Sequence, residues 1–130
     1  NPENSHVIPA LIKKVMEAEK DVIVWGSGAQ TRSFLYVKDL SRALMLVLSK
    51  NPGISPINIG SEEEITIKDL MLLIIKLSGK DLEMKYDLSK PEGQRRKVAD
   101  ITLAKKLIDW TPEYTLERGM KETIDWYNAL

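Results

Sequence analysis

The feature of this sequence that most limits its fold is the shortness of its β-rich runs, which are separated by longer segments with helical periodicity. Strands are predicted at 21–25, 32–36, 57–60 and 82–86. Helices are predicted at 5–19, 38–49, 66–78 and 101–108, and from 115 onward. Short strands scattered among helices predict an α/β chain, or α+β when it is taken in isolation, in which helix dominates.

Capping residues indicate where several of these helices begin and end. Ser5 and Thr115 stand at helix starts as N-caps. Thr66 is followed three residues later by Asp69, which resembles a capping box. Gly79 is a typical residue at the end of a helix.

Two segments raise the question of what covers them. The helix at 38–49 is apolar nearly all round, so we expect it to be buried. The strands are too few for a sheet of their own. We therefore expect 57–60 to be an edge strand, or to belong to a sheet whose other strands lie elsewhere.

Composition excludes several classes of protein. The 130 residues suffice for one domain, and 19 basic residues balance 19 acidic ones, so the chain has no overall charge for binding nucleic acid. It contains no cysteine and a single histidine, His6, which excludes a disulfide framework and a multi-histidine metal site. Its longest apolar runs, such as 70–75, are too short to span a bilayer. No signal peptide is visible, so a cytoplasmic location is expected.

The segment "VIVWGSGAQTRSFLYV" at 22–37 combines a glycine-rich turn with an arginine. It lacks the Lys and Ser/Thr of a Walker phosphate loop, and its glycines precede a predicted strand where a dinucleotide fingerprint requires a helix. The favoured interpretation is a tight hairpin in which glycine supplies positive φ. Arg32 nevertheless remains a candidate for binding phosphate oxygens.

Two further features allow both a structural and a functional interpretation. His6, at a helix start, is either a capping or solvent-facing residue or a group that transfers protons near neutral pH. The basic cluster at 95–97 is either a solvated loop or a second anion clamp that faces Arg32. A groove for nucleic acid would need more basic residues and interleaved aromatic ones.

Four segments of the chain occur together in a known order: "NSHVIPALIKK", "VIVWGSGAQTRSFLYVKDL", "INIGSEEEITIKDL" and "KPEGQRRKVADITLAKKLIDWTPEYTLERGMKETIDWY". This pattern resembles the C-terminal part of extended short-chain dehydrogenases that act on nucleotide sugars, the NAD-dependent epimerase/dehydratase family. Within that family it is most similar to the GDP-L-fucose synthases. The resemblance covers essentially the whole chain.

The resemblance implies that one domain binds the cofactor and another binds the substrate. A Rossmann-type domain upstream would hold NADP or NAD together with the catalytic Ser-Tyr-x-x-x-Lys set, which has no counterpart here. Residues 1–130 would then be a single C-terminal region that binds the nucleotide diphosphate sugar. From the balanced charge and the short apolar runs we expect no nucleic-acid or membrane partner, and we expect a homo-oligomer.

The same resemblance assigns roles to five residues. His6 matches a histidine that acts as acid or base in epimerisation and lies near the cofactor. Lys14 stands where an arginine often touches the substrate, and Trp25 matches a substrate-contacting tryptophan. Arg32 matches the arginine that binds the nucleotide diphosphate, and Glu92 stands where an aspartate commonly contacts the substrate. No metal ligand is implied.

These expectations lead to one main hypothesis and one alternative. The chain is expected to be the nucleotide-sugar-binding part, with a GDP-sugar as ligand, of an NAD(P)-dependent epimerase/reductase or dehydratase, and to have no oxidoreductase turnover by itself. The alternative is a non-enzymatic module of the same origin that binds nucleotide sugars or only self-associates.

Overall fold

A computed structural model describes residues 6–53 and 55–129, which form five helices and five short strands. The helices are α1 (Val7–Glu17), α2 (Val37–Lys50), α3 (Ile67–Ser78), α4 (Thr102–Ile108) and α5 (Leu116–Asn128). The strands are β1 (Asp21–Trp25), β2 (Thr31–Ser33), β3 (Glu64–Thr66), β4 (Glu83–Asp87) and β5 (Arg96–Lys97). The predicted mixed α/β class with helix dominant is confirmed.

The predicted caps of the later helices are confirmed. The Thr66 hydroxyl accepts the Asp69 amide proton at 3.0 Å, and α3 ends at Gly79 with φ 71°. The Thr115 hydroxyl accepts an amide proton from the first turn of α5 at 3.3 Å. The N-cap predicted at Ser5 lies outside the described residues, and α1 is preceded by His6.

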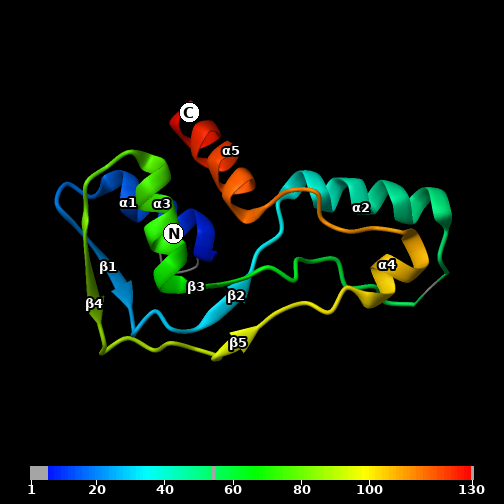
Figure 1. The fold of residues 1–130 in the computed structure, drawn as a ribbon, viewed down its shortest axis with the longest axis horizontal. Helices are drawn as coiled ribbons and strands as arrows, with labels where there is room; N and C mark the ends of the chain where they lie inside the picture. Colours follow the sequence, from blue (N-terminus) through cyan, green and yellow to red (C-terminus); the bar gives the residue numbers. More distant parts are fainter. Residues whose placement is uncertain (1–5, 54, 130) are drawn as a thin grey trace.

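The strands form two small sheets. In the first, β1 and β4 run parallel, with Asp21 opposite Glu83 and Trp25 opposite Asp87. In the second, β2 lies between β3, which is antiparallel to it, and β5, which is parallel. Figure 1 shows the β1–β4 sheet on the left-hand side and the second sheet toward the lower edge, joined by the turn after β1.

The predicted hairpin between 21–25 and 32–36 is therefore wrong. The glycine turn leads from one sheet into the other, because each strand finds its partner farther along the chain. The Gly26 amide donates to the Asp87 carbonyl at 2.9 Å and extends the β1–β4 ladder. The Thr31 amide donates to the Arg95 carbonyl at 2.9 Å and joins β2 to the β5 segment.

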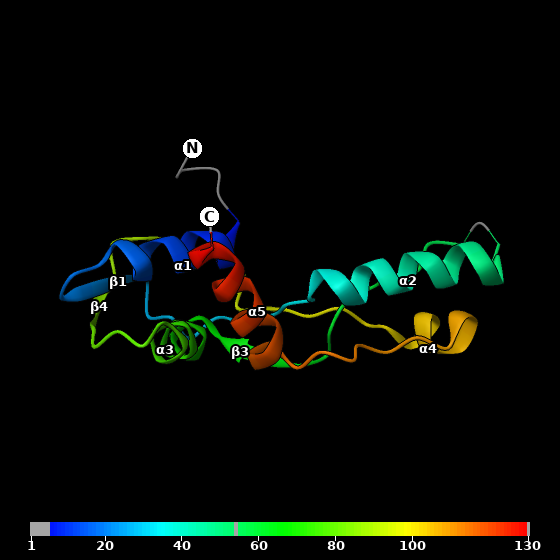
Figure 2. The same cartoon turned by 90° about the horizontal axis from the view of Figure 1, so that it is seen from above.

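Two apolar clusters divide the molecule into what we call the large lobe and the small lobe. The large lobe comprises α1, β1, β4, α3 and α5, and the small lobe comprises α2, α4 and the buried Trp110. The chain passes between the lobes at 34–36, 51–63, 98–101 and 109–115. Figures 1 and 2 show α2 and α4 at one end of an elongated molecule, apart from α1 and α3.

The prediction that 38–49 is buried on nearly all sides is wrong. Ala43 is the buried apolar residue of α2, whereas Val37, Leu40, Leu44, Met45 and Leu48 are exposed. We call these five residues the outer face of α2. Its exposure follows from the packing, because α4 covers only the opposite side of α2 (Figure 2).

The strand predicted at 57–60 is also absent from the described part of the chain. Ile57 and Ile59 pack against the Trp110 cluster without a strand ladder. No neighbouring strand is present there to pair with this segment within the described residues, and the next ladder begins at β3.

Candidate functional site

A pocket of about 260 Å³ lies in the large lobe, between α1, the end of β1, β2, the start of α3 and the segment after β4. All four predicted substrate-binding residues line it: Lys14, Trp25, Arg32 and Glu92. Apart from Gln30, the rest of the lining is apolar. His6 is exposed and does not line the pocket. It directly precedes Val7, which is a lining residue.

The pocket lies at the carboxyl ends of two parallel strands. Trp25 is the last residue of β1, and Pro91 and Glu92 follow β4 in the next loop. Because parallel strands end at the same edge of a sheet, side chains far apart in the sequence meet there, as ligand sites of α/β folds commonly do.

The glycine turn beside the pocket is shaped to receive Glu92. Gly26 and Gly28 have φ values of 68° and 72°, a region that other residues rarely adopt. A side chain at Gly26 would also overlap the Glu92 side chain. Glu92 Oε1 accepts the Ser27 amide proton at 2.6 Å. The Ser27 hydroxyl and amide together lower the pKa of Glu92, so that this carboxylate is held in its charged form.

Three amides of the glycine turn are already engaged within the protein, which argues against the turn as a phosphate cradle. A cradle needs backbone N–H groups that are free to point at the anion. Here the Gly26 amide donates to a carbonyl, the Ser27 amide to a carboxylate, and the Ala29 amide to the Ser27 hydroxyl. The turn also leads into β2, so it does not fit the strand–loop–helix that binds a dinucleotide.

Trp25 offers an aromatic surface between two lysines. The residue is 51% exposed, and the ammonium groups of Lys14 and Lys90 lie 4.7 Å and 5.6 Å from its ring centroid. Burial lowers the pKa of Lys14. A half-exposed indole beside cationic groups can stack on the ring of an anionic ligand.

Arg32 brings a positive charge that no carboxylate of the described chain neutralises. Its Nη1 donates to the carbonyls of Thr31 and Gln94 at 2.6 Å and 2.7 Å, which fixes the guanidinium in place. Within residues 6–53 and 55–129 it takes part in no ion pair. A guanidinium held in this way can bind two oxygens of a phosphate at once.

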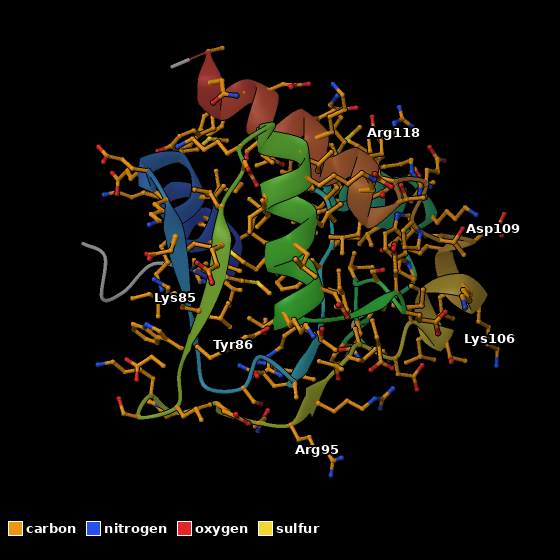
Figure 3. All side chains as sticks on the ribbon, turned by 60° about the vertical axis from the view of Figure 1, so that its left-hand side comes forward. Lys85, Tyr86, Arg95, Lys106, Asp109 and Arg118 are labelled. Atoms are coloured by element: carbon orange, nitrogen blue, oxygen red, sulfur yellow. The ribbon has the colours of Figure 1, made fainter. Side chains whose placement is uncertain are left out.

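The basic cluster at 95–97 is not part of this pocket. Arg96 Nε donates to both carboxylate oxygens of Glu64 at 3.1 Å and 3.0 Å. Arg95, which directly precedes β5, projects away from the body of the molecule (Figure 3). The geometry thus favours a solvated basic segment over a second anion clamp that faces Arg32.

Two polar residues near the pocket were missed by the sequence analysis. Gln30 is buried and lines the pocket two residues before Arg32, and the alternation of side chains along a strand could have indicated it. Lys90 lies near the Trp25 ring but belongs to a loop, where no periodicity indicates direction.

Asp39 is a buried charge with a structural role. Its carboxylate accepts the backbone amide protons of Glu113 and Tyr114, each at 2.9 Å, and pairs with Arg42 at 3.3 Å. Its backbone carbonyl accepts from the Trp110 indole at 3.2 Å. The residue therefore ties α2 to the segment that precedes α5, away from the pocket.

No helix within the described residues is long and apolar enough to cross a membrane.

Comparison with known proteins identifies relatives of this chain. The profile of the NAD dependent epimerase/dehydratase family matches residues 1–60. GDP-L-fucose synthase 1 of Arabidopsis thaliana is 40% identical over 131 residues, which cover 98% of this chain and 40% of that protein.

Solved structures show the same similarity. A GDP-L-fucose synthetase from Naegleria fowleri superposes with a TM-score of 0.86 at 30% identity, over 99% of this chain and 41% of that one. A UDP-glucuronic acid 4-epimerase from Bacillus cereus, solved with UDP-glucuronic acid and NAD, superposes with a TM-score of 0.82 at 30% identity, over 96% of this chain and 40% of that one.

The chain thus spans about 40% of the length of the relatives it matches. Its similarity to them extends over nearly all of its own residues. The resemblance predicted from its sequence, to the NAD-dependent epimerase/dehydratase family and within that family to the GDP-L-fucose synthases, is confirmed.

Proposed function

We propose that this chain is the nucleotide-sugar-binding part of an NAD(P)-dependent epimerase/reductase or dehydratase, with a GDP-sugar as its ligand. The observation that carries the proposal is the convergence of Lys14, Trp25, Arg32 and Glu92 on one pocket. These residues come from α1, β1, β2 and the loop after β4, so their meeting is a property of the fold and not of one sequence motif.

The pocket supplies a group for each part of such a ligand. Arg32 would bind the diphosphate through its planar fork, and Lys14 would add a second positive charge. Trp25 would stack on a ring of the ligand, and the charged Glu92 would accept hydrogen bonds from hydroxyl groups. Binding the diphosphate at a distance from the reacting carbon holds the sugar ring in position for reaction.

His6 is proposed as the acid or base of the reaction. It directly precedes α1, next to the pocket residue Val7. An imidazole can remove or return a proton at a carbon beside a keto group, through an enolate. NADP or NAD, when bound to the rest of such an enzyme, supplies the hydride that reduces the ketone.

We expect the isolated chain to have no oxidoreductase turnover, because its glycine turn does not fit a dinucleotide. Oxidation of NADPH by this chain alone, with a 4-keto-6-deoxy sugar nucleotide, would contradict that expectation.

The proposed ligand can be tested directly on the chain. Thermal unfolding is measured with GDP-, UDP- and dTDP-sugars, and with inorganic diphosphate as the probe for Arg32 alone. A ligand that binds the folded state raises the unfolding temperature with concentration. The largest shift is expected for the GDP-sugar, and no shift with any nucleotide sugar would overturn the proposal.

One observation favours the alternative of a self-associating module. The outer face of α2 is exposed and apolar, as expected of a surface that normally has a partner. In this alternative a second copy of the chain covers that face, and the pocket has no catalytic role.

A further inference from the structure

Gln30 is a buried amide that lines the pocket without a partner. It is 8% exposed, and its Oε1 is fully covered and accepts no hydrogen bond. Among the described residues only one other buried side-chain polar atom lacks a hydrogen bond, Nε of Arg42. That atom lies 3.3 Å from a carboxylate oxygen of Glu113, so its charge is compensated. The Gln30 oxygen has no such compensation.

The position of Gln30 is fixed by its backbone and not by its side chain. Its carbonyl accepts the Ile67 amide proton at 3.1 Å, at the start of α3. It directly precedes β2, so alternation along the strand places its side chain on the same face as that of Arg32. The amide and the guanidinium thus line the same pocket from neighbouring positions on one face.

The buried part of the pocket lining is otherwise apolar and offers no partner for the Gln30 amide. Leu11, Val24 and Ile67 line the same pocket and are buried. A buried acceptor with no partner destabilises the free protein, and such groups call for a specific explanation. A ligand group that enters the pocket would provide the missing partner.

We propose that Gln30 is a ligand-binding residue whose carboxamide bonds a hydroxyl group of a ring attached to the diphosphate. This inference rests on the proposed function. A carboxamide is both donor and acceptor, and so is a hydroxyl, so the two can pair in either sense after rotation of the amide. Its place beside Arg32 puts this contact next to the diphosphate, where either the hexose or the ribose presents hydroxyl groups.

The test compares two substitutions of the same kind. Gln30→Met keeps the length of the side chain and removes both hydrogen-bonding groups. Gln94→Met makes the same change at an exposed position outside the pocket lining, and it leaves the backbone carbonyl that holds Arg32. For each variant, calorimetry measures affinity for a GDP-hexose, for GDP and for inorganic diphosphate, and thermal unfolding is measured without ligand.

The Gln30→Met variant is expected to bind the GDP-hexose about 5- to 10-fold more weakly, the scale of one lost hydrogen bond. Its unfolding temperature without ligand should equal or exceed that of the wild type, because the unsatisfied acceptor is gone. Affinity for inorganic diphosphate should not change. Weaker binding of the GDP-hexose alone assigns the contact to the hexose, whereas an equal loss with GDP assigns it to the ribose, and both results support the inference.

The opposing outcomes are distinct. Unchanged affinity for the GDP-hexose in Gln30→Met, or an equal loss in Gln94→Met, overturns this inference and leaves the proposed function standing. A lower unfolding temperature with unchanged affinity assigns Gln30 a structural role only. Failure of the wild-type chain to bind any nucleotide diphosphate overturns the proposed function and this inference together.

Discussion

At the scale of single residues, the pocket is marked by positive charges that the described chain leaves unpaired. Neither Lys14 nor Arg32 forms an ion pair within the described residues, whereas Arg96 and Lys85 each pair with a carboxylate at the surface. The paired residues support the fold. The unpaired ones leave a positive potential inside a half-enclosed pocket, where it attracts anionic ligands more strongly than in open water.

Arg32→Ala is predicted to weaken binding of a nucleotide diphosphate by about 1.5–3 kcal/mol, the scale of a hydrogen bond to a charged group. Calorimetry measures the change, and Arg95→Ala is the matched control because that side chain projects away from the fold (Figure 3). If both variants bind as the wild type does, Arg32 serves only to hold the Thr31 and Gln94 carbonyls.

A second group of charges, remote from the pocket, makes stability depend on pH. Glu122 on α5 accepts from Lys38 at 2.6 Å and from the Tyr36 hydroxyl at 2.9 Å. These contacts hold the pKa of Glu122 below its ordinary value of 4.5, and the contact with Lys38 has the largest effect. A carboxyl whose pKa is lowered by folding contributes stability above its unfolded pKa and loses it as pH falls through the folded one.

Glu122→Gln is therefore predicted to lower the unfolding temperature at pH 7 and to make little difference at pH values below the folded pKa of Glu122. Thermal unfolding across a range of about pH 2–7, which spans the ordinary glutamate pKa, measures the difference. The control is Glu117→Gln on the same helix, whose ion pair with Lys76 is exposed and should contribute little. A difference that stays constant with pH would contradict the prediction.

At the scale of elements, the helices were predictable and the strand partners were not. Thr66, Gly79 and Thr115 fix helix ends through contacts within four residues, which local sequence reveals. The strand predicted at 82–86 is displaced by one residue from β4. The hairpin failed because β1 pairs with a strand about sixty residues away, and no local pattern encodes that choice.

The prediction that α2 is buried was wrong for a related reason. Its apolar composition predicts that it is covered, but within the described part of the chain α4 and the Trp110 cluster pack against one side of it only. The pocket residues were named from a resemblance, and their meeting depends on the β1–β4 pairing. Gln30 was missed because the alternation that places its side chain on the same face as that of Arg32 becomes informative only once its burial is known.

Thr66→Ala is predicted to lower the free energy of unfolding by about 1 kcal/mol, since it removes the N-cap of α3. Urea unfolding measures the loss. Thr102→Ala, at the exposed first position of α4, is the control and should change stability by less than about 0.5 kcal/mol. An equal effect of the two substitutions would show that the cap contact contributes nothing specific.

At the scale of the whole molecule, the two lobes differ in how well they are covered. The large lobe encloses its core between helices and strands, whereas the small lobe has one buried side and the outer face of α2 on the other. The match to GDP-L-fucose synthase 1 of Arabidopsis thaliana covers 40% of that protein. An apolar face of this kind is expected to pair with another surface.

We predict that the chain by itself forms a dimer through the outer face of α2. Light scattering should give twice the mass of one chain, and Met45→Lys combined with Leu48→Lys should restore the single mass. Leu88→Lys is the matched control, because Leu88 is 75% exposed and Leu48 77%, but Leu88 lies in the loop after β4. A wild-type chain that is monomeric at all concentrations would contradict the prediction.

Because β1 pairs with β4, ligand binding depends on a folding step that joins distant parts of the sequence. Trp25 at the end of β1 and Glu92 in the loop after β4 both line the pocket, so a loop of about sixty residues must close before the pocket is complete. Partly folded forms in which the two strands are apart cannot hold the ligand. A ligand in this pocket therefore stabilises the paired arrangement of two distant parts of the sequence. It lowers the population of every state in which that long loop is open.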